Sequence, residues 1–119
     1  MPRNRPEQAI QRAVFQHMAI RGASDCFAFH VPNGGLRSRI EASIMKGLGV
    51  RAGIPDIIAI KAGLTYALEL KAPGGRLSPA QSEVHAALRA AGASVAVACG
   101  LDDTLRQLEA WHLLRGCHG

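Results

Sequence analysis

The stretch that most constrains the fold is GIPDIIAIKAGLTYALELK, which spans residues 53–71. Two apolar runs, 56–61 and 65–71, stand on either side of Ala62-Gly63, and short apolar runs bounded by a turn are typical of β-strands. Two-residue connections that contain glycine are common hairpin turns. The stretch therefore predicts an antiparallel hairpin.

Besides Lys61 at the turn, three charged residues, Asp56, Glu69 and Lys71, interrupt the apolar pattern of this hairpin. If the loop holds two residues, Lys61 lies opposite Leu64, and the same register places Asp56 opposite Glu69 with roughly 5 Å between their β-carbons. Lys71 follows Glu69 by two positions, so its side chain points to the same face. The two acids and the lysine are expected to cluster.

Two carboxylates this close repel each other unless a positive group lies between them. A proton can serve and would raise one pKa strongly, whereas Mg²⁺ binds carboxylate oxygens and leaves positions for water and phosphate. A metal beside a lysine is suited to hydrolysing a phosphodiester. A cross-strand salt bridge on a solvated sheet face is the simpler alternative. The apolar neighbours of the three residues favour a site, because buried charges need a compensating partner.

The rest of the chain predicts alternating helices and strands around this hairpin. Apolar periodicity, turn residues and helix caps predict a helix from Pro6 to Gly22, a strand at 26–31, a helix at 38–48, the hairpin, a helix at 78–92, a strand at 94–99 and a helix after Gly100. This α-β-α-β-β-α-β-α order predicts one α/β domain over residues 1–119, with helices on both faces of a mixed β-sheet. Residues 1–5, a basic arm, and the tail 115–119 are expected to be flexible.

Two helix starts carry capping signals. Ser78 precedes Pro79 and is followed three residues later by Gln81, which predicts a capping box. Asp102 or Asp103 is predicted to cap the last helix, because its short polar side chain can accept hydrogen bonds from free N–H groups.

The apolar residues of other elements are assigned to the core. In helix 38–48 they recur every four residues, and the side chains predicted to face inward are Ile40, Ile44 and Leu48. The apolar strand 94–99 is predicted to lie inside the sheet. His85 falls on a predicted helix at no ligand spacing and is interpreted as structural.

The net charge of +5 and the pI of about 9.7 favour a polyanionic partner such as nucleic acid. The spaced glycines before Pro55 match neither a P-loop nor a dinucleotide fingerprint, so no nucleotide cofactor is expected. No apolar run is long enough for a membrane span, and the polar, basic N-terminus predicts no signal peptide. A cytoplasmic protein is therefore expected.

The motifs around the hairpin carry a family resemblance. Pro55-Asp56, followed thirteen residues later by Glu69-Leu70-Lys71, resembles the PD-(D/E)XK nuclease motif. The sequences PNGG, GIPDIIAI, ALELKAPGGRLSPAQ and GASVAVACGLDD, with an N-terminal helix that carries Glu7, are similar to the VRR-NUC family of virus-type replication and repair nucleases. The resemblance covers residues 6–112.

The resemblance implies a restriction-endonuclease-like core and a phosphodiesterase that depends on Mg²⁺ or Mn²⁺. By match to the motif, Asp56, Glu69 and the backbone carbonyl of Leu70 would bind the metal. Lys71 would position and activate the attacking water.

Two further residues match family positions near the site. Glu7 matches an acid close to the metal that can also bind it, and Gln81 matches a glutamine that supports the site. Simpler roles stay compatible with these, because Glu7 suits the first turn of a helix and Gln81 completes a capping box.

The residues expected to contact the DNA backbone are Asn33, Gly34, Arg37, Arg39, Arg51 and Arg76. A flexible turn beside arginines can follow phosphates without reading bases, although a solvated surface loop would look the same in sequence. His30 is left open between a core histidine and a DNA contact.

Stand-alone chains of this size resemble phage or bacterial members that act as homodimers on branched DNA such as Holliday junctions. A two-fold dimer supplies two sites for a symmetric cut. Two alternatives stay open: a nicking or flap nuclease of replication or packaging without junction preference, and a catalytically silent nucleic-acid-binding module.

Overall fold

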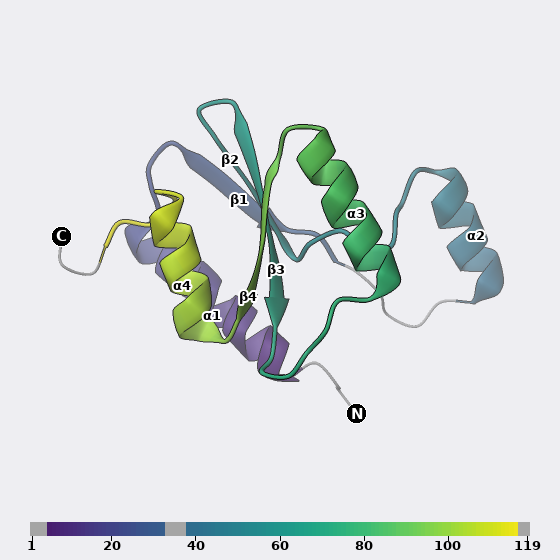
Figure 1. Ribbon diagram of the computed structural model, residues 1–119, viewed down its shortest axis with the longest axis horizontal. Coiled ribbons are helices and arrows are strands. Elements are labelled where there is room, and N and C mark those ends of the chain that lie inside the picture. The colour runs from purple at the N-terminus through teal and green to yellow at the C-terminus, as the bar shows by residue number, and fades with distance from the viewer. Residues whose placement is uncertain (1–4, 33–37, 117–119) are drawn as a thin grey trace.

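The computed structural model describes residues 5–32 and 38–116. Its elements are α1 (Arg5–Arg21), β1 (Cys26–His30), α2 (Arg39–Gly47), β2 (Ile57–Lys61), β3 (Leu64–Lys71), α3 (Pro79–Ala90), β4 (Ser94–Cys99) and α4 (Leu101–Ala110). Their order is the predicted one (Figure 1). No described helix is both long and apolar enough to cross a membrane.

The four strands form one mixed sheet in the order β1-β2-β3-β4, with β4 parallel to β3 and the other neighbours antiparallel. Ile57 pairs with Leu68 and Lys61 with Leu64, which confirms the register predicted from a two-residue loop. The loop residues Ala62 and Gly63 have φ values of 53° and 77°. Positive φ at both central positions is the conformation of a type I′ turn, whose twist suits a hairpin.

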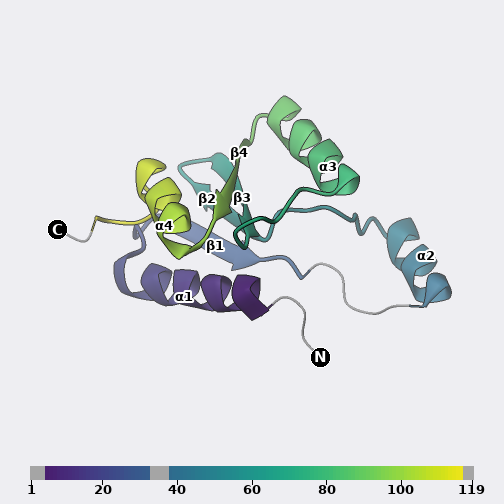
Figure 2. The ribbon, with the colours of Figure 1, turned by 60° about the horizontal axis from the view of Figure 1, so that its bottom comes forward.

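Helices cover both faces of the sheet, as predicted. α1 and α4 pack on one face, and α3 lies over the other face at β3 and β4 (Figures 1 and 2). The core between the sheet, α1 and α4 is aliphatic, and its fully buried residues include Val14, Leu68, Leu70 and Leu108.

The prediction that α2 turns its apolar residues into the core is wrong. Ile40, Ile44 and Leu48 are 73%, 58% and 78% exposed, and no residue of α2 is buried. The helix stands away from the sheet in both views (Figures 1 and 2). Periodicity identified the apolar face of this helix correctly, but periodicity does not specify what covers such a face.

Two further assignments need correction. β4 lies at the edge of the sheet formed by the described strands, although its apolar sequence predicted an interior position. α4 begins at Leu101 with Gly100 as its N-cap, so neither predicted aspartate caps it. Asp103 instead accepts a hydrogen bond from the Cys99 N–H at 2.9 Å, and its carboxylate still suits the first turn of the helix.

The capping box of α3 is confirmed. Ser78 Oγ accepts a hydrogen bond from the Gln81 N–H at 3.1 Å, and Gln81 Oε1 accepts one from the Ser78 N–H at 2.8 Å. At the chain ends, Arg5 is the first residue of α1, and the Arg115 N–H donates to the Arg21 carbonyl at 2.8 Å. Residues 1–4 and 117–119 lie outside the described part.

Candidate active site

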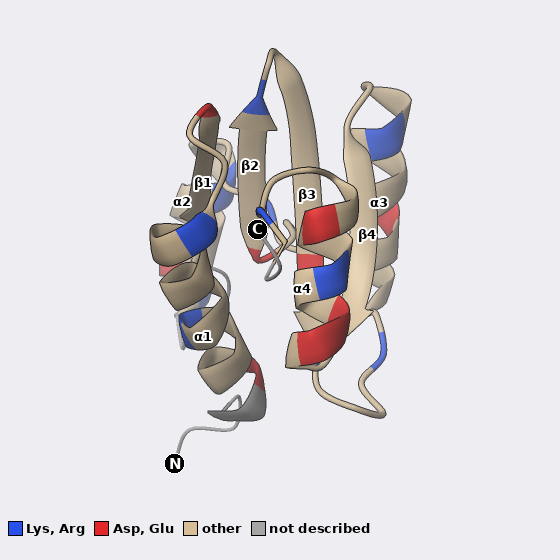
Figure 3. Ribbon diagram, turned by 90° about the vertical axis from the view of Figure 1, so that its left-hand side faces the viewer, with Lys and Arg blue, Asp and Glu red and all other residues tan. Residues whose placement is uncertain are grey.

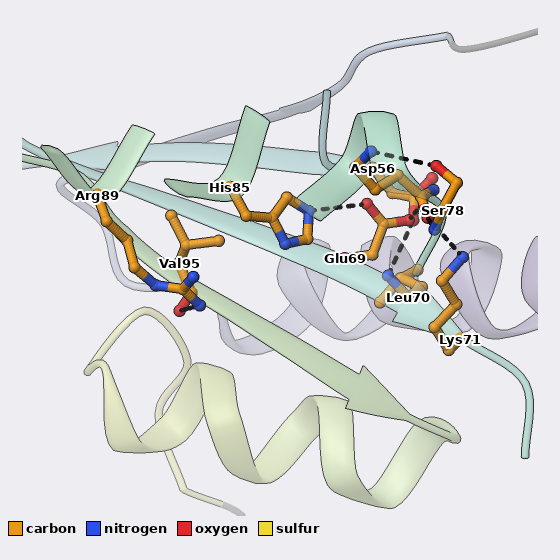
Figure 4. A network of polar contacts seen from close by, with 9 residues as sticks. Asp56, Glu69, Leu70, Lys71, Ser78, His85, Arg89 and Val95 are labelled. Atoms are coloured by element: carbon orange, nitrogen blue, oxygen red, sulfur yellow. Dashed lines mark hydrogen bonds and ion pairs between the residues drawn. The ribbon is translucent and has the colours of Figure 1, made fainter. Parts of the chain in front are cut away.

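Asp56 immediately precedes β2. Its backbone carbonyl and its carboxylate contact the neighbouring segments on opposite sides. Its carbonyl accepts a hydrogen bond from the Val31 N–H at 3.2 Å. Its carboxylate turns to β3, where Oδ2 accepts from the Leu70 N–H at 2.8 Å (Figure 4). These contacts fix Asp56 between the chain after β1 and β3, and the ladder register places it opposite Glu69.

The carbonyl of Leu70 lies on the same edge of β3 as the Asp56 carboxylate. Within a strand, the N–H and C=O of one residue point to the same side, and those of the next residue point to the other. The Leu70 N–H points at Asp56, and the Lys71 carbonyl accepts from the Gly100 N–H on the opposite side. The predicted carbonyl ligand therefore faces the predicted carboxylate ligand.

Glu69 is held by two side chains of α3. The residue is only 3% exposed, yet both of its oxygens have a partner. Its Oε1 lies 3.3 Å from His85 Nε2 (Figure 4), and its Oε2 accepts from Gln81 Nε2 at 3.3 Å. α3 thus fixes the orientation of a carboxylate that β3 supplies.

Gln81 joins the helix cap to the site. Its Oε1, which accepts from the Ser78 N–H, also accepts from Lys71 Nζ at 3.1 Å. Its Nε2 donates to Glu69. The capping role and the predicted supporting role are therefore carried out by one side chain at the same time.

Glu7 reaches the same end of the sheet from α1. Its Oε2 accepts a hydrogen bond from the N–H of Ala72, the residue after Lys71, at 3.4 Å. The structure thus brings together all five residues predicted as catalytic, namely Glu7, Asp56, Glu69, Lys71 and Gln81.

The electrostatics of the site are those of two crowded acids. Burial, together with hydrogen bonding to and repulsion from Asp56, raises the pKa of Glu69 to about 8, against the opposing effect of Lys71. Within residues 5–32 and 38–116, neither carboxylate has a lysine or arginine ion pair. The cross-strand salt bridge considered from the sequence is therefore not formed, since Lys71 binds Gln81 instead.

The donor set fits a hard divalent cation. Two carboxylates and one carbonyl on a shared edge are oxygen ligands of the kind that Mg²⁺ and Mn²⁺ prefer. The raised pKa of Glu69 means that its carboxyl group keeps a proton up to unusually high pH, which marks a place where positive charge is needed. Among the described residues, no group of three His, Cys, Asp or Glu side chains is placed to hold a metal ion.

His85 is the residue of the site that sequence reasoning missed. It is 1% exposed and lies on α3, one turn after Gln81. Burial, with smaller effects of Arg89 and Lys71, lowers its pKa, so the ring is neutral. Its spacing of four residues from Gln81 places both side chains on one helix face, a signal that could have been used.

Gly53 explains how the segment before Asp56 reaches the site. A β-carbon at this position would lie 2.5 Å from the Ala80 carbonyl oxygen and 2.9 Å from the Gln81 nitrogen, and its φ is +89°. A glycine at this position therefore allows a close approach of the chain to the start of α3. It packs the chain before β2 against the helix that carries Gln81.

The predicted DNA contacts are only partly described. Asn33, Gly34 and Arg37 lie outside the described residues, whereas Arg39, Arg51 and Arg76 are exposed. α4 carries one arginine, Arg106, among the acidic residues Asp102, Asp103 and Glu109 (Figure 3), so it offers no basic surface.

His30 is exposed at the end of β1, so it is not a core histidine. Its Nδ1 lies 2.7 Å from the Asp56 carbonyl oxygen. With the proton on Nδ1, the ring donates to that oxygen and ties β1 to the start of β2. The DNA contact considered for this residue stays a prediction.

Comparison with known proteins agrees with this architecture. The VRR-NUC domain model matches residues 5–101. One solved VRR-NUC domain protein is 24% identical with a TM-score of 0.75, covering 92% of this chain and 89% of that chain. A second VRR-NUC domain is 19% identical with a TM-score of 0.60, covering 88% of this chain and 95% of that chain. Hjc, a Holliday junction resolvase of Archaeoglobus fulgidus, is 20% identical with a TM-score of 0.48, covering 78% of this chain and 67% of that chain. No curated protein matches significantly.

Proposed function

The chain belongs to the VRR-NUC nuclease family, and from that premise we propose a Mg²⁺- or Mn²⁺-dependent endonuclease that cuts branched DNA, such as Holliday junctions, as a homodimer. The observation that carries the proposal is the pair of acids Asp56 and Glu69, held at one end of the hairpin without a lysine or arginine ion pair in the described chain. Two carboxylates this close repel each other unless a proton or a cation neutralises part of their charge.

The groups that would hold the metal are the Asp56 and Glu69 carboxylates and the Leu70 carbonyl, with Glu7 close by. The chemistry that a divalent cation supplies in such a site is a lowered pKa for water and neutralisation of charge on phosphoryl oxygens. The chain contributes fixed ligand positions. Asp56 is held by the Leu70 N–H, and Glu69 by two groups of α3.

Lys71 contributes a positive charge on the face of the acids. Its Nζ donates one hydrogen bond to Gln81, which leaves two N–H groups for other acceptors. An ammonium in this place donates to the attacking water or to a phosphoryl oxygen, and so stabilises charge that develops during cleavage.

The branched substrate and the homodimer rest on the family resemblance and on the chain's charge. Arg39, Arg51 and Arg76 are exposed, and with Asn33, Gly34 and Arg37 they would contact phosphates rather than bases. A two-fold dimer would present two sites to two of the four strands of a junction.

A panel of matched DNA substrates tests the proposal. A four-way junction, a 5′ flap, a nicked duplex and a plain duplex are incubated at one salt concentration with Mg²⁺, Mn²⁺ or EDTA, because nonspecific affinity depends steeply on salt. The wild type should cut the junction only with metal. Asp56→Asn should bind the junction and fail to cut it.

The other outcomes identify the alternatives. Equal cutting of flaps and junctions would favour a nicking or flap nuclease. If the wild type cuts nothing with either metal while both proteins bind DNA equally, the chain is a nucleic-acid-binding module and the enzyme proposal is wrong.

A further inference from the structure

The apolar face of α2 has no cover within the described chain. Its exposed residues Ile40, Ile44 and Leu48 follow one another at four-residue spacing and share one stripe, and the next segment adds Val50. A helix of nine residues is short, and isolated helices of that length are marginal in water even with a capping box. Such a helix needs a surface to pack on.

A second uncovered apolar surface lies on the sheet, where β1 and β2 extend beyond α3. Phe27 pairs with Ile60 across these strands, and Phe29 lies on the same face with its ring centroid 5.8 Å from that of Phe27. Phe27 is 68% exposed, and Phe29 and Ile60 are also exposed. Since side chains alternate along a strand, Ile60 shares its face with Asp56.

We propose that α2 of one chain packs on the β1–β2 face of a second copy, and reciprocally, so that this contact is the homodimer interface. The inference rests on the dimer of the proposed function and names its surface. A reciprocal contact between two different patches closes with two-fold symmetry and leaves neither patch exposed.

The exposed apolar area matches what a stable dimer needs. An aliphatic side chain offers about 100 Å² of apolar surface and a phenylalanine about 150–250 Å². Scaled by exposure, the two patches together offer roughly 500 Å² per chain. A standard interface buries about 800 Å² per partner, of which about 60% is apolar. One patch alone would be too small.

The surface suits a protein better than DNA. The side chains of Ile40, Ile44, Leu48, Phe27 and Phe29 are exposed and offer no donors to phosphate oxygens. The α2 stripe was predicted to face a core, and in the dimer it does so, in the core formed with the partner.

Sedimentation velocity over a concentration series, with and without a four-way junction, tests the interface. Leu48→Asp and Phe27→Asp alter the two patches separately, and each should raise the dimer dissociation constant at least about tenfold, because a charge would be buried at the contact. Ile20→Asp is the matched control, since Ile20 is 77% exposed on α1, outside both patches. It should leave the dimer unchanged.

Circular dichroism establishes that each variant folds, as expected for changes at exposed positions. A monomeric wild type, or a dimer that either patch variant leaves intact, overturns the inference. Cleavage is recorded separately. If Asp56→Asn no longer cuts but is still a dimer, the result supports the proposed active site and does not test the interface. A monomeric wild type that still nicks duplex DNA would rule out the proposed interface but not the proposed nuclease activity.

Discussion

His85 Nε2 lies 3.3 Å from Glu69 Oε1, and both residues are buried. The other ring nitrogen, Nδ1, has no hydrogen-bond partner among the described residues. A bare acceptor is tolerated in a protein interior better than an unpaired N–H, so the proton of the neutral ring sits on Nε2. His85 is therefore a donor that orients the carboxylate, and it acts through Glu69.

Removing this donor should weaken metal binding. His85→Phe leaves Glu69 Oε1 without its partner, and loss of a hydrogen bond to a metal ligand typically lowers affinity about 10–100-fold. His85→Gln, which keeps an N–H donor, should retain most of the metal affinity of the wild type. Calorimetric titration with Mn²⁺ measures the affinity directly. A positioning role is ruled out if His85→Phe binds Mn²⁺ as the wild type does.

The raised pKa of Glu69 predicts a metal-free protein that loses stability as the pH rises. The pKa is about 8 in the folded chain and 4.5 in the reference state, so between these values the folded state holds a proton that the unfolded state has lost. The free energy of unfolding then falls by up to about 1.4 kcal/mol per pH unit.

The window from pH 6.5 to 8 isolates this effect. The lowered pKa of His85 acts in the opposite direction, but only below its ordinary value of 6.5. Urea denaturation in EDTA should therefore show falling stability across the window, and Glu69→Gln should flatten the slope. Mg²⁺ should also flatten it, because cation and proton compete for the pair. A flat wild-type profile in EDTA would mean that the acids share no proton.

The close approach of Gly53 to α3 predicts a large effect of a single methyl group. Gly53→Ala combines a positive φ with a clash against the Ala80 carbonyl, and should cost on the order of 3 kcal/mol. Gly63→Ala is the matched control, since its φ is +77° and nothing lies within 4 Å. It should cost only about 1–2 kcal/mol. Equal losses for the two variants would show that the packing at residue 53 is unimportant.

A comparison with Ser78 separates the capping role of Gln81 from its role in the site. Ser78→Ala removes the hydroxyl of the capping box and should lower stability by about 1 kcal/mol while leaving most of the cleavage rate. Gln81→Ala removes the cap and also the contacts to Glu69 and Lys71, so stability and rate should both fall. Denaturation and single-turnover cleavage measure the two effects. If both variants cut DNA at the same rate, Gln81 serves only as a cap.

The parts of the site that the sequence predicted are those set by short-range geometry. A two-residue turn at Ala62-Gly63 determines the whole hairpin register, and the register determines that Asp56 faces Glu69. The capping box of α3 is equally local, since it involves residues three apart. Such features depend on neighbours in the chain, and the sequence contains them.

The parts that escaped prediction depend on distant contacts. Whether Leu48 is buried depends on which surfaces pack together in the folded protein. The edge position of β4 depends on how the strands are ordered in the sheet. His85 looked like an ordinary helix residue because its partner, Glu69, lies sixteen positions away. Only the packing of α3 on β3 brings the two together.

The turn at Ala62-Gly63 has a practical consequence for watching the protein at work. It closes the hairpin at the end opposite Asp56, roughly 17 Å away for a five-residue strand, and both of its residues are exposed. A fluorophore attached to one of these two residues keeps the loop at two residues and so keeps the register, and it would report on the molecule without touching the acids.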